Sequence, residues 1–164
     1  MNELIGRVVS FEKKVFQDQQ ALYSTLAHHG QFPKALMISC ADSRIVPEHI
    51  VQANPGDLFV CRNAGNIVPP YATQNGGVTS TVEYAVMALG IRDIIVCGHS
   101  DCGAMKGLSG DPKNLESRPN VLAWLRHGAA ARQVVDSSYP EMDEVARVRA
   151  LSLENVVAQL GNLK

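Results

Sequence analysis

Five residues in two short segments of this sequence are of types that bind metal ions or move protons. Cys40, Asp42 and Arg44 lie in the first segment, and His99 and Cys102 lie in the second. Two thiolates and one imidazole suit Zn²⁺, which binds sulfur and nitrogen tetrahedrally and keeps one position open in catalytic sites. Asp42 or a water molecule could take that fourth position. The residue types therefore predict a zinc site with a carboxylate and a guanidinium beside it.

Each segment directly follows a short apolar run. Three such runs cover residues 35–40, 57–62 and 93–98, and the two polar segments come after the first and the third. Apolar runs bounded by turn-forming residues are typical of buried strands in a parallel sheet. Because sites in parallel sheets form beyond the carboxyl ends of the strands, we expect the two segments to meet there.

Helical periodicity separates the strands and fills both ends of the chain. The helices are expected over residues 4–16, 19–28, 46–53, 78–89, 120–135 and 140–163. We expect a capping box from Ser80 to Glu83 in the fourth helix. In the last helix we expect an apolar stripe of Val145, Val148, Leu151, Val156, Leu160 and Leu163. The pattern predicts an α/β fold, a mostly parallel β-sheet flanked by helices with an N-terminal helical arm, in a single domain spanning 1–164.

Composition excludes several classes of protein. Lys+Arg 15 against Asp+Glu 16 gives a net charge of -1 over 164 residues, so no basic field attracts nucleic acid. No apolar run approaches the roughly 18 residues that a membrane span needs, and charged residues are scattered through the first twenty positions. We therefore expect a cytoplasmic protein with neither a nucleic-acid partner nor a membrane partner.

The remaining cysteines and histidines are interpreted as structural or solvated residues. Four cysteines are too few for a disulfide scaffold. Cys61 and Cys97 lie inside strand runs, where core packing is the expected role. The other histidines, expected to be solvated or capping, are His28, His29, His49 and His127. Cys40 and Cys102 are then the candidate thiolate ligands, and a structural site with four protein ligands stays open.

Two motifs and the stretch between them resemble the β-class carbonic anhydrases. The motifs are Cys-Ala-Asp-Ser-Arg at residues 40–44 and Gly-His-Ser-Asp-Cys-Gly at residues 98–103, and residues 55–60 and 62–70 are also similar to that family. The resemblance covers essentially the whole chain and is strongest to the bacterial and cyanobacterial branch. Members usually continue for several dozen residues past the position of Leu163, so this chain is expected to lack the usual C-terminal segment.

The resemblance implies the reversible hydration of carbon dioxide to bicarbonate and a proton. Zn²⁺ would be bound by Cys40, His99 and Cys102, and Asp42 with Arg44 would form a catalytic pair beside the fourth position. In one state of such a site Asp42 pairs with Arg44, and in the other it binds the metal itself.

The family's substrate pocket maps onto Gln31, Phe59, Ala64, Tyr84 and the backbone amide of Gly103. Several of these residues, Gln31 among them, reach across a dimer interface in the family, which implies a homodimer or a higher homo-oligomer. Spacing alone would instead place Phe59 and Tyr84 in the core and Gln31 in a loop.

Three alternative functions stay open at this point. A related zinc enzyme could hydrolyse a sulfur analogue such as carbon disulfide, and a non-catalytic zinc or assembly protein could keep the same ligands. Asp42 and Arg44, which zinc binding alone does not need, argue against the second. A thiol redox protein would be expected to carry a Cys-x-x-Cys pair, which this sequence lacks. The cyanobacterial resemblance adds a carboxysome as a further option for the location.

Overall fold

The computed structural model describes residues 2–71 and 76–164. Its strands are β1 (Ala35–Cys40), β2 (Leu58–Asn63) and β3 (Ile94–Cys97). Its α-helices are α1 (Asn2–Ser10), α2 (Phe16–Asp18), α3 (Gln20–His29), α4 (Pro47–Ile50), α5 (Gly77–Glu83), α6 (Gly103–Ser109), α7 (Pro119–Leu125), α8 (Ala129–Ser138) and α9 (Glu144–Asn162). Short π-helical segments cover Phe11–Val15 and Tyr84–Ala88, and 3₁₀ turns cover Pro112–Leu115 and Arg126–Gly128.

The sheet is parallel, and β1 lies at its centre. The strand order is β2-β1-β3, and β1 pairs in parallel with both neighbours. All six residues of β1 are buried, which explains why this strand is a continuous apolar run rather than an alternating one. The α/β prediction is confirmed, and the carboxyl ends of β1 and β3 lie side by side at one edge of the sheet.

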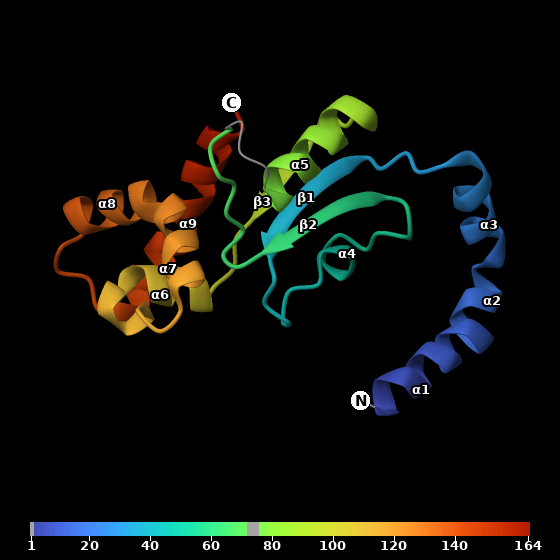
Figure 1. Cartoon of the computed structure of the whole chain (residues 1–164), viewed down its shortest axis with the longest axis horizontal. Coiled ribbons are helices and arrows are strands. Elements are labelled where there is room, and N and C mark those ends of the chain that lie inside the picture. Colours follow the sequence, from blue (N-terminus) through green and yellow to red (C-terminus); the bar gives the residue numbers. More distant parts are fainter. Residues whose placement is uncertain (1, 72–75) are drawn as a thin grey trace.

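Two apolar clusters hold the layers together. One cluster, between the sheet and α5, contains Leu36 and Ile38 from β1 together with Ala85. The other includes Cys40 and Cys102 and packs them against buried residues of α6, α8 and α9. Figure 1 shows these C-terminal helices gathered on one side of the sheet. The predicted thiolate ligands therefore lie inside the second cluster.

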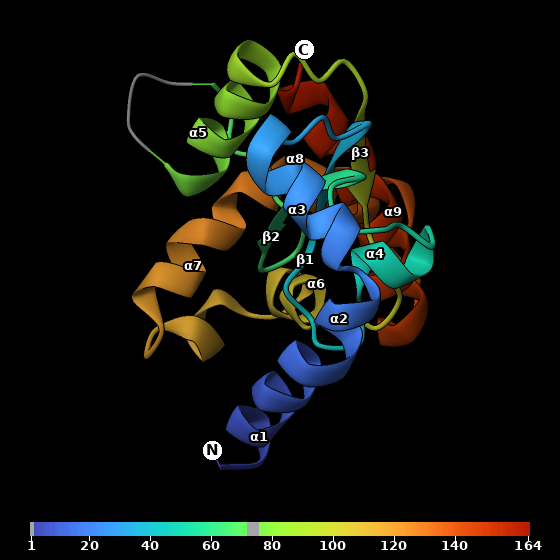
Figure 2. The same cartoon turned by 90° about the vertical axis from the view of Figure 1, so that its right-hand side faces the viewer.

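The N-terminal helices form an arm that extends away from this body. α1, the π-helical segment and α2 follow one another over residues 2–18, with α1 farthest from the sheet (Figure 1, Figure 2). The rings of Phe16 and Tyr23 lie 5.4 Å apart and connect α2 to α3. Leu4 and Val8 on α1 are 63% and 65% exposed. The amphipathic helix is confirmed, and in the single chain its apolar residues face solvent.

Several predicted helix boundaries were wrong for identifiable reasons. The helix over 46–53 is reduced to α4, and Gln52 beyond it has a φ of 52°. The Ser80 to Glu83 capping box is wrong: α5 starts after Gly76, so Ser80 lies inside the helix and donates to the Gly76 carbonyl oxygen at 2.9 Å. Helix α6, which follows Cys102 directly, had not been predicted.

The apolar stripe predicted for the last helix is also partly wrong. Val148 and Leu151 of α9 are buried, but Val145 is 81% exposed. The buried face continues with the polar residues Asn155 and Gln159 instead. Among the described residues, no helix is both long enough and apolar enough to span a membrane.

Candidate metal centre

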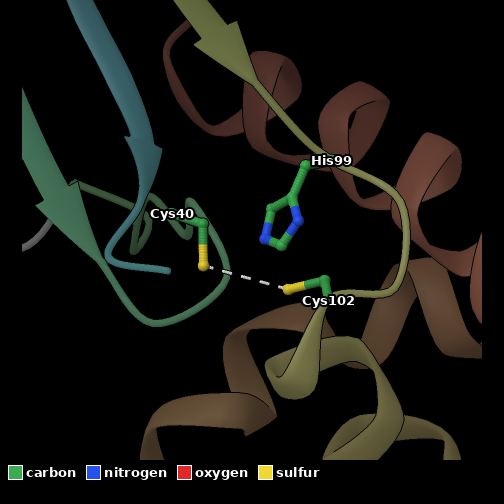
Figure 3. A group of neighbouring side chains, drawn as sticks. All are labelled: Cys40, His99 and Cys102. Carbon is green, nitrogen blue, oxygen red and sulfur yellow. Dashed lines mark hydrogen bonds between the residues drawn. The ribbon is translucent and has the colours of Figure 1, made fainter. Parts of the chain in front are cut away.

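Three side chains from two strand ends converge on one point. Cys40 is the last residue of β1, His99 follows the end of β3, and Cys102 precedes α6. Their potential ligand atoms all lie within 4.8 Å of one another, and the two sulfur atoms are 3.9 Å apart without a disulfide. Figure 3 shows the imidazole directed toward the gap between the two sulfurs. The prediction that the two segments meet at the edge of the sheet is confirmed.

The imidazole of His99 is oriented as a metal ligand would be. Its Nδ1 lies 2.8 Å from the carbonyl oxygen of Ser100, and because a carbonyl only accepts, Nδ1 carries the hydrogen. The lone pair is then on Nε2, which is buried and has no hydrogen-bond partner among the described residues. Buried nitrogens are normally paired, and metal-binding histidines commonly donate their other N–H to a carbonyl. The unpaired Nε2 beside two sulfurs therefore fits a metal.

The two thiols are almost removed from solvent. Cys40 is 5% exposed and Cys102 is 1% exposed. Burial raises the pKa of the Cys102 thiol, and the nearby Cys40 adds to this rise. The backbone N–H of Gly65 donates to the Cys40 sulfur at 3.4 Å. Soft sulfur ligands with one nitrogen match Zn²⁺ better than they match Mg²⁺ or Ca²⁺, which prefer oxygen.

Asp42 and Arg44 form a two-point ion pair beside this group. The Nε and Nη2 atoms of Arg44 donate to the two carboxylate oxygens at 2.9 and 2.8 Å, and the Arg44 backbone N–H adds a bond of 3.0 Å. The Arg44 hydrogen bonds hold the pKa of the Asp42 carboxyl well below its usual range. Asp42 Oδ2 lies 4.0 Å from His99 Nε2. An ionised carboxylate therefore stands next to the ligand group and is bound to Arg44.

The guanidinium of Arg44 is itself fixed from the second loop. Its Nη1 donates to Asp101 Oδ2 at 3.0 Å, and its Nη2 donates to the Asp101 carbonyl oxygen at 3.1 Å. Lys106 also pairs with the Asp101 carboxylate. The hydrogen bonds from Lys106 and Arg44 lower the pKa of Asp101. Asp101 thus connects the two motifs through Arg44.

The five residues proposed for the pocket fall into separate places in this chain. Ala64 and Gly103 line one cleft of about 380 Å³. The rings of Phe59 and Tyr84 contact each other at a centroid distance of 6.0 Å, and Phe59 pairs with Leu36, near the start of β1. At a rise of about 3.3 Å per residue this is about 13 Å along the strand from Cys40. Gln31 is exposed and lies before β1.

The prediction from helical spacing that Tyr84 is a core residue was wrong. Its helical position favoured a core residue, but Tyr84 is 52% exposed. Phe59 is partly buried and packs against the cluster under α5. The part of the chain that the structure describes therefore brings together Ala64 and Gly103 at one end of the sheet and Phe59 and Tyr84 at the other.

Comparisons with known proteins agree with this geometry. A family profile described as carbonic anhydrase matches residues 35–164. The solved structure of the β-carbonic anhydrase CcaA superimposes with a TM-score of 0.94 at 44% sequence identity, covering 99% of this chain and 73% of that chain. This chain belongs to the β-carbonic anhydrase family.

Relatives from two bacteria match the chain over all 164 residues. A carbonic anhydrase of Pseudomonas aeruginosa is 49% identical, and the chain spans 73% of its length. A carbonic anhydrase of Synechocystis is 44% identical, and here the chain spans 60% of the relative's length. A solved structure titled as one of two tetrameric β-carbonic anhydrases of Sordaria macrospora has a TM-score of 0.85 at 30% identity, covering 99% of this chain and 79% of that one.

Several residues that support the β-carbonic anhydrase site were missed in the sequence. Arg62 donates to the backbone carbonyl oxygens of Cys40 and Asp42 at 3.1 and 2.8 Å. Gly65 has a φ of +84°, and a Cβ there would lie 2.9 Å from Ala104 Cβ. The Gly-Asn pair at 65–66 was a readable signal, since both residues favour positive φ. Nothing in the local pattern around Arg62 indicates its long-range partners.

The cysteines and histidines interpreted as structural lie outside the metal-ligand group found in the described residues. Cys61 is buried and Cys97 is partly buried, and burial raises the pKa of both thiols. His28 bonds within α3, with Nδ1 at 2.7 Å from the Ser24 carbonyl oxygen. The ring of His127 contacts that of Trp124. His29 and His49 are exposed.

Proposed function

We propose that this chain catalyses the reversible hydration of carbon dioxide to bicarbonate, with Zn²⁺ bound by Cys40, His99 and Cys102. The observation that carries the proposal is the buried Nε2 of His99, which has no hydrogen-bond partner in the described part of the chain and faces two thiols beside an ionised carboxylate. Family membership agrees with it. An ion bound only for stability would not require Asp42 and Arg44 at this position.

The residues around the ligand group have distinct tasks in this proposal. Zinc held by two thiolates and one imidazole would supply Lewis acidity that makes a nucleophile available from water. Because two negative sulfurs offset the charge of the cation, we expect this activity at alkaline pH. Asp42 accepts a hydrogen bond from the attacking oxygen and so orients its lone pair toward the carbon. Arg44 keeps Asp42 ionised and in place through the two-point ion pair. We also propose a second state of the site, in which Asp42 leaves Arg44 and binds the metal.

Substrate contacts are proposed for Ala64, the Gly103 amide, Gln31, Phe59 and Tyr84. The first two lie at the carboxyl end of the sheet, whereas Phe59 and Tyr84 lie at the other end. One chain therefore cannot form a pocket from all five. We propose that a second copy supplies the missing residues, so that the active form is a homodimer or a larger homo-oligomer. The tetrameric Sordaria macrospora structure supports this proposal.

A reducing location follows from the chemistry of the ligands. Two thiols 3.9 Å apart would oxidise readily where disulfides persist, and zinc needs both as thiolates. We therefore propose a cytoplasmic protein, with a carboxysome as the more specific option, acting as a single domain over 1–164 with neither nucleic acid nor membrane as a partner.

The proposal is tested by metal analysis together with a carbon dioxide hydration assay on the chain as it stands. We expect about one zinc per chain. Hydration activity should disappear with a chelator and return with added zinc. The assay is repeated at protein concentrations high enough for the chain to form oligomers. Zinc binding without carbon dioxide hydration under these conditions would contradict the enzyme proposal and favour a non-catalytic zinc protein. Hydrolysis of carbon disulfide without carbon dioxide hydration would favour the sulfur-analogue enzyme.

A further inference from the structure

The buried face of α9 carries two amide side chains where the helix pattern calls for apolar ones. Asn155 and Gln159 are both fully buried, one helical turn apart, and Val148 and Leu151 precede them on the same face. A buried amide is costly unless its donors and acceptors are paired. Both side chains are paired, with each other and with the backbone of Gly65 and Val68, about ninety positions earlier in the chain.

The hydrogen bonds form a chain in which each amide can face only one way. Asn155 Nδ2 donates to the Gly65 carbonyl oxygen at 2.9 Å, and Gln159 Nε2 donates to Asn155 Oδ1 at 2.9 Å. Gln159 Oε1 accepts from the Val68 backbone N–H at 2.8 Å. A carbonyl can only accept and an N–H can only donate, so the two backbone groups fix both amides. No isosteric acid or hydrocarbon could replace Asn155 here without leaving a group unpaired.

Gly65 connects this chain of bonds to the metal ligands. Its carbonyl oxygen accepts from Asn155, and its N–H donates to the sulfur of Cys40 at 3.4 Å. On the opposite side, Trp124 Nε1 donates to the Ala64 carbonyl oxygen at 2.8 Å. The backbone of Gly65 also packs closely against α6, because a Cβ added at Gly65 would lie 2.9 Å from Ala104 Cβ. The donor to the thiolate is thus held from α6, α7 and α9 at once.

We propose that Asn155 is a positioning residue for the Cys40 thiolate, acting through Gly65. An N–H directed at the sulfur would hold the thiolate where it binds the metal, so losing this bond would weaken metal binding. The same N–H withdraws electron density from the sulfur, so losing it would lower the energy of sulfur-to-metal charge transfer. Partners of metal ligands typically change metal affinity or activity by about 10- to 100-fold when they are removed. This inference rests on the proposed function, because it concerns the same metal centre.

A purely structural role for Asn155 makes a different prediction. It would lower stability without changing the electronic state of a metal bound to Cys40. Cobalt in place of zinc separates the two, because the energy of its sulfur-to-metal charge-transfer band depends on hydrogen bonding to the sulfur. Ser152 provides the matched control: it is buried on α9 three positions before Asn155, and among the described residues its Oγ donates to the Val148 carbonyl oxygen within the helix.

The experiment compares the full chain with Asn155→Leu and Ser152→Ala, all checked for folding by circular dichroism. We expect Asn155→Leu to weaken zinc binding by about 10- to 100-fold in a chelator competition and to shift the cobalt charge-transfer band to lower energy. Ser152→Ala should match the parent in both measurements. A folded Asn155→Leu with parental zinc affinity and an unchanged cobalt spectrum would overturn the inference.

Two other results of this experiment would also test the inference. If Asn155→Leu does not fold, Trp124→Phe provides a second test, because it removes the hydrogen bond to the Ala64 carbonyl oxygen in the same segment. This variant should weaken zinc binding about tenfold and shift the cobalt band to lower energy. Parental zinc affinity and an unchanged band in Trp124→Phe would overturn the inference. If the unaltered chain binds neither zinc nor cobalt, the proposed function itself fails, and the inference fails with it.

Discussion

The two ends of the sheet differ in how completely one chain builds them. At the carboxyl end each side chain is held by a hydrogen bond: the Gly65 N–H donates to Cys40, His99 donates to the Ser100 carbonyl oxygen, and Arg44 donates to Asp42. At the amino end Gln31 and Tyr84 are exposed, and on the separate N-terminal arm Leu4 and Val8 of α1 are exposed as well. The difference suggests that the fold of one chain preorganises metal binding, whereas substrate contacts depend on association.

The largest effect is expected from removing one ligand at the fixed end. Cys102→Ser replaces a thiolate by a weak oxygen donor, so zinc content should fall from about one per chain to near zero. Cys97→Ser, at a partly buried thiol outside the ligand group, should keep its zinc. Elemental analysis of the purified proteins makes the comparison. Retention of zinc by Cys102→Ser and its loss from Cys97→Ser would show that the wrong cysteine is assigned.

The next largest effect is expected on turnover without loss of metal. Arg44→Ala leaves all three ligands in place but releases Asp42, and we expect hydration activity to fall by about 10²- to 10⁴-fold, as for loss of a proton-handling group. Lys34→Ala is the control at the opposite end, where Lys34 pairs with Asp57 at 2.8 Å, and it should keep parental activity. Stopped-flow hydration with parallel zinc analysis tests this. Parental activity of Arg44→Ala would remove the ion pair from the mechanism.

A negative charge on the N-terminal arm should weaken the proposed association of two chains. Val8 is exposed on α1, so Val8→Asp should leave the fold and zinc content of the chain unchanged. If the arm packs against a second copy, this substitution should lower the oligomer mass and reduce activity by about tenfold, equivalent to about 1.4 kcal/mol. Gln17→Asp introduces the same side chain at an exposed polar position and should do neither. Light scattering and assays that show no difference between the two variants would refute this role for the arm.

The smallest effect concerns the two thiols outside the ligand group, Cys61 in β2 and Cys97 at the end of β3. Burial raises the pKa of Cys61 and Cys97, so the thiolate fraction of each at pH 8 is below that of a free cysteine, whose pKa is about 8.5. Alkylation of both should therefore be several-fold slower than in denaturant and should quicken as the pH rises further. Mass spectrometry of iodoacetamide-treated protein identifies each site. Equal rates in folded and unfolded protein would contradict the protection of these two thiols by burial.

The sequence was most informative where a pattern is local. The bounds of β1 were predicted correctly because a strand at the centre of a parallel sheet is buried on both faces and therefore apolar throughout. The motifs ending β1 and following β3 placed the ligand group correctly, since parallel strands bring their carboxyl ends together. These two inferences were enough to locate Cys40, His99 and Cys102.

The sequence was least informative where a residue depends on distant partners. Val145 matched the apolar period of α9 but is exposed, while Asn155 broke that period and is buried. The partner of Asn155 is a backbone carbonyl 90 residues away, which no window of sequence contains. Tyr84 presents the same difficulty in another form, because its helical spacing favoured the core, whereas its ring is 52% exposed and contacts that of Phe59. An amide pair four positions apart in an apolar helix face is the signal that could have been read.

The long separations within the metal centre also set the order of events during synthesis. Cys40 and Cys102 are 62 positions apart, and the bond between Gly65 and Asn155 spans 90 positions. At translation speeds of about 5–20 residues per second, Cys40 leaves the ribosome on the order of ten seconds before α9 can dock. During that interval its thiol is unprotected and can meet any soft metal or oxidant in the cell. The proposed metal centre is therefore completed only after α9 has been synthesised, because the bond from Asn155 to Gly65 cannot form before then.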